Sequence, residues 1–232
     1  MDFGKLLYSL FRFTGDIVHL YTMIILFKKI RETKSVSGLS LKTQFLYLVV
    51  FMARYLDLFH FWFSSLLDVY NFIMKVVYIS LQSLLIYMIR YKYFYSYDVF
   101  LDTFNVYNLV VPCAVLSVFL KTSTYGLTDY FVEFLYTFSI LLESVAILPQ
   151  LIQLQESGEA ETLTSQYIFF LGLYRLFYVM NWIVKLCFGF RVNHLLLATG
   201  VIQTLLYADF FVIYYKYVFM KKGNERLPKT SK

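Results

Sequence analysis

Seven long apolar runs, separated by short polar breaks, limit what this chain can fold into. A run of about 20 apolar residues is long enough to cross the hydrocarbon core of a bilayer as a helix. Of the 232 residues, 59% are hydrophobic and 16% are charged, against about 45–50% and about 25% in soluble domains. Because a soluble fold could not bury so much apolar surface, we predict an all-α integral membrane protein.

The breaks between the runs are charged or turn-forming, as in "KTSTYGLTD" and "QESGEAET". They leave no room for a separate soluble domain. We therefore expect one seven-helix transmembrane domain over residues 1–219 and a basic tail over 220–232. The predicted helices cover residues 8–27, 43–62, 70–89, 105–121, 130–154, 166–187 and 194–219.

Lysine and arginine are unevenly divided between the two sides of this topology. Thirteen of the 21 lie on the side of the C-terminus, three lie on the other side, and five fall inside predicted spans. Cytoplasmic loops carry the excess of basic residues, so the tail is predicted to be cytosolic and the N-terminus luminal. The net charge of +6 then reflects membrane topology, and no nucleic acid is expected as a partner.

An internal similarity suggests a repeat. The segment "SLKTQFLYLVVF" at 40–51 resembles "TLTSQYIFFLGL" at 162–173, and each opens a predicted span after a polar loop. This predicts two three-helix units joined by the fourth helix, an arrangement that many transporters use.

Signatures of catalysis and of metal binding are missing from the sequence. Cys113 and Cys187 lie in apolar stretches and are predicted to be small buried hydrophobic residues. Glu133 and Glu143 are ten residues apart, too far along a helix to act as a close carboxylate pair. No nucleophile, metal-ligand spacing or phosphate-binding loop is found. We therefore expect neither an enzyme nor a cofactor.

Three ionisable residues interrupt the first apolar run. Arg12, Asp16 and His19 fall within an arc of about 60° on a helix. Ionisable groups inside spans normally face a bundle interior or a water-filled cavity and are functional by default. An internal pair of Arg12 with Asp16 that only stabilises the fold is the alternative for Asp16.

Further polar residues lie in the other predicted spans. In the sixth span, Tyr174, Tyr178, Trp182 and Lys185 share an arc of about 80°; such a stripe often serves only for packing, but a lysine inside a membrane favours a functional face. Lys75 lies near a span end and is interpreted as structural. The remaining residues are Arg54, Tyr55 and Asp57 in the second span, Glu133 and Glu143 in the fifth, and Asp209 in the last, which is expected to pair with a neighbour.

Convergence of Arg12, Arg54 and Lys185 would create a positively charged pocket. A peptide C-terminus with acidic side chains fits three cations better than a sugar does, because carboxylates form charge-assisted hydrogen bonds with them. Glu133 and Asp57 would supply a small acidic corner for one basic residue. Histidine titrates near pH 6.5, so protonation of His19 would favour an acidic ligand at lower pH.

Five segments together resemble one known family. They are "RFTGDIVHL", "ARYLDLF", "TFSILLESVAILPQL", "GEAETLTSQYIFFLGLYRLFYVMNW" and "VIQTLLYADFF". They are similar to the signature segments of the ER lumen protein-retaining receptors, the KDEL receptors, and the resemblance runs from about residue 10 to 222. It implies a SWEET-like arrangement of seven helices that binds C-terminal Lys-Asp-Glu-Leu-type signals of soluble ER proteins in the Golgi.

The resemblance also implies a role for each matching position. Arg54 and Tyr55 would hold the terminal carboxylate, Arg12 the ligand's Glu, and Lys185 its Asp. The other implied roles are as follows: Glu133 and Asp57 for the basic residue four from the end, Trp182 for pocket shape, His19 for proton sensing, Tyr174, Tyr178 and Glu143 for a hydrogen-bonded switch with Arg175 nearby, and Asp209 for retrograde traffic. Asp16 is interpreted, from its place in the first span, as a structural partner.

Three departures from the family pattern concern ligand preference: Lys185 replaces the usual Arg, Asn193 an acidic residue, and Tyr136 a Trp. In the tail, Lys216, Lys221 and Lys222 are implied to bind the COPI coat, or they are only topological anchors. The implied location is the ER membrane, the cis-Golgi membrane and COPI vesicles. A SWEET or PQ-loop transporter of small solutes is the alternative, supported by the repeat and by "ILPQL".

Overall fold

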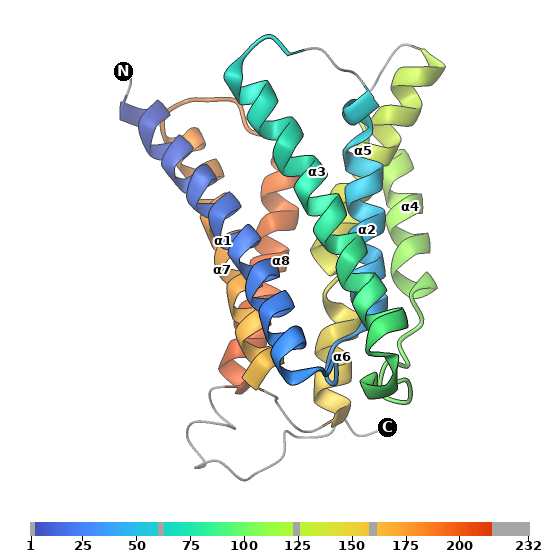
Figure 1. The fold of residues 1–232 in the computed structure, drawn as a ribbon. Helices are drawn as coiled ribbons and strands as arrows, with labels where there is room; N and C mark the ends of the chain where they lie inside the picture. The colour runs from blue at the N-terminus through green and yellow to red at the C-terminus, as the bar shows by residue number, and fades with distance from the viewer. Residues whose placement is uncertain (1–2, 60–62, 123–125, 158–161, 215–232) are drawn as a thin grey trace. The chain divides into compact units, whose positions relative to one another are not determined.

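The computed structural model describes residues 3–59, 63–122, 126–157 and 162–214, and every regular element in them is helical (Figure 1). The α-helices are α1 (Phe3–Thr33), α2 (Leu41–Arg54), α3 (Leu66–Tyr87), α4 (Tyr107–Leu120), α5 (Leu127–Val145), α6 (Leu148–Ser157), α7 (Thr162–Cys187) and α8 (His194–Tyr214). Short 3-10 turns cover Leu56–Phe59 and Phe94–Ser96, and a π-helical turn covers Met88–Lys92.

Five helical segments of the described chain are long and apolar enough to cross a membrane. They are α1, α3 with its π-helical turn, α5 with α6, α7 and α8. α2 and α4 have 14 residues each, which at 1.5 Å per residue gives about 21 Å, short of a hydrocarbon core of about 30 Å. The chain is thus an all-helical integral membrane protein, and its seven spans stay a prediction.

Helix ends differ from prediction for local reasons. The first helix extends to Thr33 because "KKIRET" consists mainly of good helix formers. The second ends eight residues early, at Arg54, where the chain tightens into a 3-10 turn. The fifth is divided after Val145, because Pro149 lacks the amide that would donate to the carbonyl of Val145. The third begins with a capping box between Ser65 and Asp68.

The chain divides into two compact units. Unit 1 comprises residues 1–39 and 151–232, and unit 2 comprises residues 40–150. These boundaries differ from those of the predicted three-helix repeat, which stays a prediction. The two cysteines are free thiols; Cys113 is buried as predicted, whereas Cys187 at the end of α7 is exposed, contrary to prediction.

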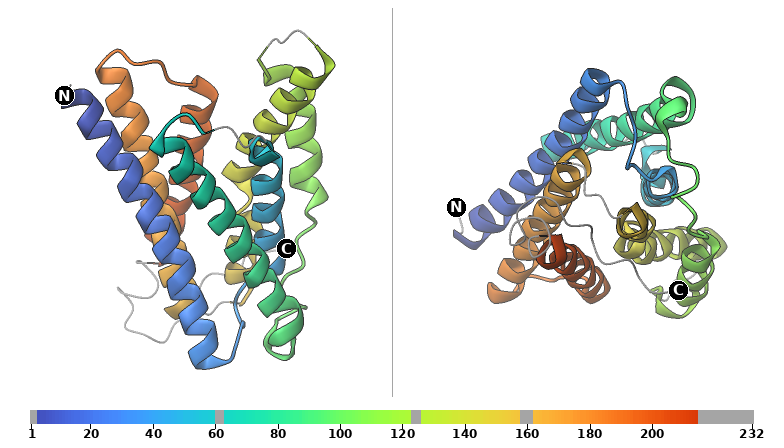
Figure 2. Two further views of the ribbon diagram at one scale, coloured as in Figure 1. Left: turned by 45° about the horizontal axis from the view of Figure 1, so that its top comes forward. Right: turned by 90° about the horizontal axis from the view of Figure 1, so that it is seen from below.

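In unit 1, α7 packs against both α1 and α8, and α1 and α7 run side by side in Figures 1 and 2. Glycines allow close approach between these helices. A Cβ added at Gly172 of α7 would lie 3.1 Å from Tyr207 of α8. A Cβ at Gly15 of α1 would lie 3.4 Å from the ring of Tyr178 in α7.

In unit 2, α5 packs against α2 and α4, and α2 also packs against α3. Asp102 is 3% exposed and ties the start of α2 to the segment after α3. Its carboxylate accepts hydrogen bonds from Ser40 Oγ (2.9 Å), the Lys42 amide (3.2 Å) and the Tyr97 hydroxyl (2.6 Å). Burial and the bond to Asp102 raise the pKa of Tyr97 above its ordinary value, so this hydroxyl remains a donor.

Candidate functional site

The ionisable face of α1 packs against α7 within unit 1. Asp16 and His19 are 8% and 7% exposed. The Tyr178 hydroxyl donates to Asp16, and the His19 ring stacks on Tyr174 with 4.2 Å between centroids and 9° between planes. The predicted arc on the first helix and the aromatic stripe on the sixth predicted span are therefore in contact.

The aromatic stripe of α7 is continuous. Tyr178 makes an edge contact with Tyr174 (5.8 Å) and stacks on Trp182 (6.3 Å). Arg175 is 4% exposed, with its guanidinium 5.4 Å from the centre of the Tyr174 ring and 6.0 Å from that of Tyr178. A cation over aromatic faces is stabilised by the ring quadrupole, so Arg175 reinforces the stripe from inside the unit.

Two cations lie on these packed helices of unit 1, Arg12 on α1 and Lys185 on α7. The Lys185 ammonium lies 4.9 Å from the centre of the Tyr8 ring. Two cations on packed membrane-spanning helices are electrostatically suited to an anionic partner.

Unit 2 contains a partly buried ion pair. Arg54 Nη1 donates to Glu143, and Arg54 Nε donates to Ser139 Oγ at 3.1 Å. The side chains of Arg54 and Glu143 are 18% and 8% exposed. Tyr55 follows Arg54 directly as the C-cap of α2 and stacks on Phe51 at 5.7 Å. Arg54 is therefore held in place by α5, and its predicted contact with a terminal carboxylate would have to compete with Glu143.

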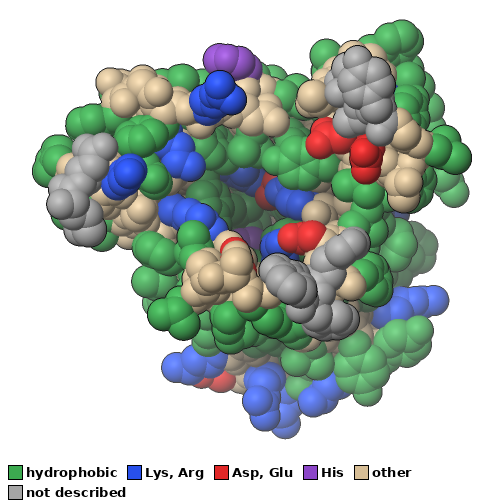
Figure 3. Space-filling view, turned by 90° about the horizontal axis from the view of Figure 1, so that it is seen from above, with side chains coloured by type: hydrophobic (Ala, Val, Ile, Leu, Met, Phe, Trp, Pro, Cys, Tyr) green, Lys and Arg blue, Asp and Glu red, His purple; other side chains and the backbone are tan. Residues whose placement is uncertain are grey.

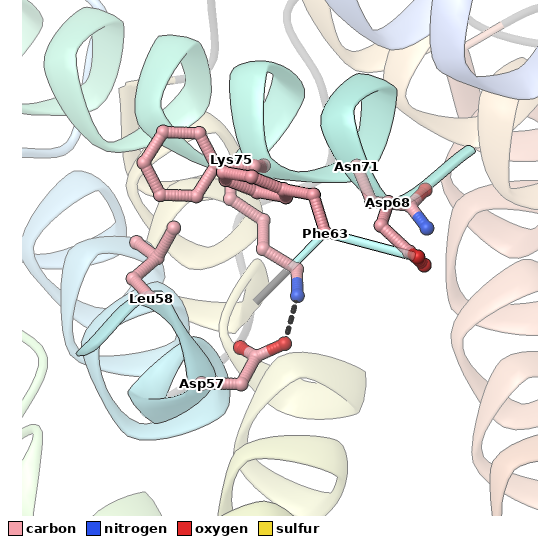
Figure 4. Close-up of a pocket in the computed structure, with 7 residues that line it drawn as sticks. Asp57, Leu58, Phe63, Asp68, Asn71 and Lys75 are labelled. Atoms are coloured by element: carbon pink, nitrogen blue, oxygen red, sulfur yellow. Dashed lines mark hydrogen bonds and ion pairs between the residues drawn. The ribbon is translucent and has the colours of Figure 1, made fainter. Parts of the chain in front are cut away.

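Asp57 lies at the edge of a cavity of about 240 Å³ within unit 2. Figure 4 shows the Lys75 ammonium reaching from α3 to the Asp57 carboxylate, with which it forms an ion pair. Lys75 also lies 5.6 Å from the centre of the Tyr55 ring. Lys75, interpreted from the sequence as only structural, is thus the partner of a predicted ligand-binding residue. The cavity is lined by Asp57, Leu58, Phe63, Asp68, Asn71, Phe72 and Lys75.

The structure places the predicted residues in two groups. Unit 1 holds Arg12, Asp16, His19, Tyr174, Arg175, Tyr178, Trp182, Lys185 and Asp209, and unit 2 holds Arg54, Tyr55, Asp57, Glu133 and Glu143. It stays a prediction that Arg12, Arg54 and Lys185 converge on one pocket. The grouping of Glu143 with the tyrosines of α7 also stays a prediction. Asp209 is exposed on α8. The tail residues Lys216, Lys221 and Lys222 lie outside the described residues.

One departure from the family pattern has a structural explanation. Asn193 Oδ1 accepts hydrogen bonds from the amides of Leu195 (3.0 Å) and Leu196 (3.2 Å), so it caps the start of α8. Asn and Asp are nearly equivalent at this position of a helix. An acidic residue could therefore serve the same capping role.

Two contact residues, Tyr8 and Ser139, were not identified from the sequence, and the pairing of Lys75 with Asp57 was not predicted either. Tyr8 lies four residues before Arg12 and Ser139 four before Glu143, so helical spacing could have found both. Lys75 is separated from Asp57 by 18 residues and a loop, and no periodicity signals that pair.

The face drawn in Figure 3 carries both basic and acidic side chains on a largely hydrophobic surface.

Comparison with known proteins gives a consistent result. The family model described as "ER lumen protein retaining receptor" matches residues 35–185. An ER lumen protein-retaining receptor from Dictyostelium discoideum is 46% identical over 209 residues, covering 90% of this chain and 94% of its own length. ER lumen protein-retaining receptor 2 from Homo sapiens is 46% identical over 206 residues (89% and 93%), and the Kluyveromyces lactis receptor is 44% identical over 226 residues (95% and 99%). The chain belongs to the ER lumen protein-retaining receptor family.

Proposed function

We propose that this protein binds the C-terminal Lys-Asp-Glu-Leu-type retrieval signal of soluble ER residents in the acidic Golgi and returns them to the ER. The observation that carries the proposal is that two packed membrane helices of a chain in this family, α1 and α7, each carry a cation, Arg12 and Lys185. Two such cations gain most from a ligand with several carboxylates, and this signal has an Asp, a Glu and a terminal carboxylate. The comparisons give no support to the transporter alternative.

In this proposal His19 makes binding dependent on pH. Its ring stacks on Tyr174, and a protonated imidazole on an aromatic face gains a cation–π interaction. Asp16 lies three residues before His19 on α1, and Arg175 of α7 lies over the same Tyr174 ring on which His19 stacks. A protonated His19 would add positive charge near an acidic ligand. Binding would then be stronger at mildly acidic pH than at neutral pH, where the cargo is released.

The direct test is binding of a labelled peptide ending in Lys-Asp-Glu-Leu to the purified full chain. We expect tight binding in mildly acidic buffer, weaker binding at neutral pH, and loss of binding when the C-terminus is amidated. If neither this peptide nor one ending in His-Asp-Glu-Leu binds at either pH, the proposed function is wrong.

A matched pair of lysine variants makes the binding test specific. Lys185→Met removes a cation expected to contact the ligand, and we expect affinity to fall about 10–100-fold, the value of a charged hydrogen bond. Lys5→Met removes an exposed lysine of α1 and should leave affinity unchanged. Equal effects of the two variants would mean that only overall charge matters.

The return step is proposed to use the COPI coat, bound through the cytosolic tail. Transmission of ligand binding across the membrane requires two states with different ligand affinity. The double variant Lys221→Ser, Lys222→Ser should therefore bind peptide normally and fail to return cargo to the ER. Retrieval that persists in this variant would show that the tail lysines serve only for topology.

A further inference from the structure

The first two turns of α1 are packed against the end of α7 and the turn that follows it. Phe3 contacts Phe188 with 6.2 Å between ring centroids. Gly4 lies so near Phe188 that a Cβ there would be 2.7 Å from its ring. These contacts fix the start of α1 in register with the last turn of α7.

Tyr8, in the second turn of this segment, contacts α7 through both its backbone and its ring. Asn181, 2% exposed, donates from Nδ2 to the Tyr8 carbonyl oxygen. The Tyr8 ring makes an edge contact with Phe190 at 5.3 Å, and its face lies 4.9 Å from the Lys185 ammonium. Asn181 and Lys185 are four residues apart on one face of α7. Backbone and ring of Tyr8 are thus both fixed, and the ring is oriented toward the ammonium.

We propose that Tyr8 is a positioning and specificity residue, which holds the Lys185 ammonium in place for an acidic side chain of the retrieval signal. This inference rests on the proposed function, in which Lys185 contacts the ligand's Asp. It adds a residue four positions before Arg12 that none of the sequence reasoning assigned to the ligand.

The chemistry of the ring explains why an aromatic partner suits this lysine. A lysine side chain has a flexible stem and lacks the planar fork by which arginine grips a carboxylate, so the ammonium must be held by something else. A carboxylate partner would hold it but would cancel its charge. A ring face attracts the cation without neutralising it and leaves its N–H donors available for a ligand. Tyr8 therefore orders Lys185 and preserves its ability to bind an anion.

The same argument predicts which change in the ligand is distinguished better when the Tyr8 ring is present. A well-placed ammonium discriminates between Asp and Asn in the signal, because only Asp offers a full negative charge. A mobile ammonium discriminates less, since it must be ordered when the ligand binds. The quantity to measure is the ratio of the Kd values for peptides ending in Lys-Asn-Glu-Leu and Lys-Asp-Glu-Leu, on the full chain at mildly acidic pH.

Three variants test the role of the ring. Tyr8→Phe keeps the aromatic face, and the ratio should stay within about twofold of wild type. Tyr8→Leu removes the face, and the ratio should fall about three- to tenfold, as expected for loss of a cation–π contact. Tyr21→Leu is the matched control, because Tyr21 also lies on α1 and packs against an α7 ring, Phe170, at 5.1 Å; its ratio should not change.

A graded series guards against misfolding of the leucine variant. Phenylalanines with one, two or three ring fluorines at position 8 keep the size of the ring while weakening its negative face. The ratio should fall stepwise along this series. In a Lys185→Met background, the same substitutions should have no effect on the ratio.

Three results would overturn the proposal. The first is a Kd ratio that fluorination leaves unchanged. The second is equally weakened binding of both peptides by Tyr8→Leu, which would mean that Tyr8 only supports the fold. An effect that persists in Lys185→Met would show that the ring acts on another group. Failure of the wild-type protein to bind either peptide would instead overturn the proposed function, and this inference with it.

Discussion

The ion pair between Arg54 and Glu143 offers a quantitative test of the unit 2 structure. The side chains are 18% and 8% exposed, so removing one partner leaves a largely buried charge without its counterion. Such a change costs about 3–5 kcal/mol in other proteins. For a chain of this size, each kcal/mol corresponds to about 2–4 °C in Tm. We therefore expect Glu143→Ala to lower Tm by about 6–20 °C.

The double-mutant cycle isolates the pair from the rest of the helix contacts. Arg54→Met combined with Glu143→Leu replaces both charges by apolar groups, which is often nearly neutral for a buried pair. The double variant should thus be more stable than either single variant, with a coupling free energy of at least about 2 kcal/mol. Unfolding in mixed detergent micelles, followed by the helical circular-dichroism signal, measures all four free energies.

An exposed ion pair in the same chain provides the control. Lys28 and Glu32 are separated by 3.9 Å between Nζ and Oε1, with side chains 74% and 54% exposed. A surface pair at this spacing is worth about 0.3–0.5 kcal/mol, so its cycle should give a coupling close to zero. Additive effects at Arg54 and Glu143, or a loss below about 1 kcal/mol for Glu143→Ala, would refute the reasoning.

Four further substitutions have defined outcomes. Gly200→Ala would place a methyl group against the Trp182 ring; we expect a changed near-UV circular-dichroism signal and a Tm lower by several degrees, and an unchanged spectrum would contradict the packing. Asp102→Asn should destabilise unit 2 by about 1–3 kcal/mol, because the buried carboxylate serves three donors; chemical unfolding tests this, and a loss below about 0.5 kcal/mol would count against it. Asp57→Asn and Lys75→Met should each change stability by less than about 1 kcal/mol, since the Asp57 side chain is 62% exposed; a larger loss by the same assay would contradict this.

Helical periodicity predicted the part of the candidate site that depends on one helix at a time. The arc of Arg12, Asp16 and His19 follows from 100° per residue, and α1 does present Asp16 and His19 to α7. Class and helix content also followed from the apolar runs, because membrane spans tolerate few charges.

Contacts that join distant segments were not predictable in this way. The pairing of Asp57 with Lys75 depends on how the loop before α3 folds back, and the cavity beside it depends on packing. The family resemblance implied that Glu143 is part of a switch with tyrosines, which stays a prediction, and the structure adds Arg54 as a partner of Glu143 within unit 2. An ionisable residue in a span indicates that it needs a partner. Several residues in other spans are chemically equivalent as that partner, and only the packing of the helices shows which of them it is.

The break in the fifth predicted span has a local cause that is visible in the sequence. Pro149 is visible in "ILPQL", and its missing amide ends the hydrogen-bonding of α5 one turn earlier. Proline near the start of a helix is well tolerated, which is why α6 begins immediately afterwards.

The length of α1 gives it the mechanical character of a lever. Its 31 residues correspond to about 46 Å, well beyond a hydrocarbon core of about 30 Å. Rotation by about 5° about one end of such a rod displaces the other end by about 4 Å. His19 and Thr33 are joined by an unbroken helix of about 21 Å. A rotation of α1 by about 5° about His19 would therefore displace Thr33 by about 2 Å.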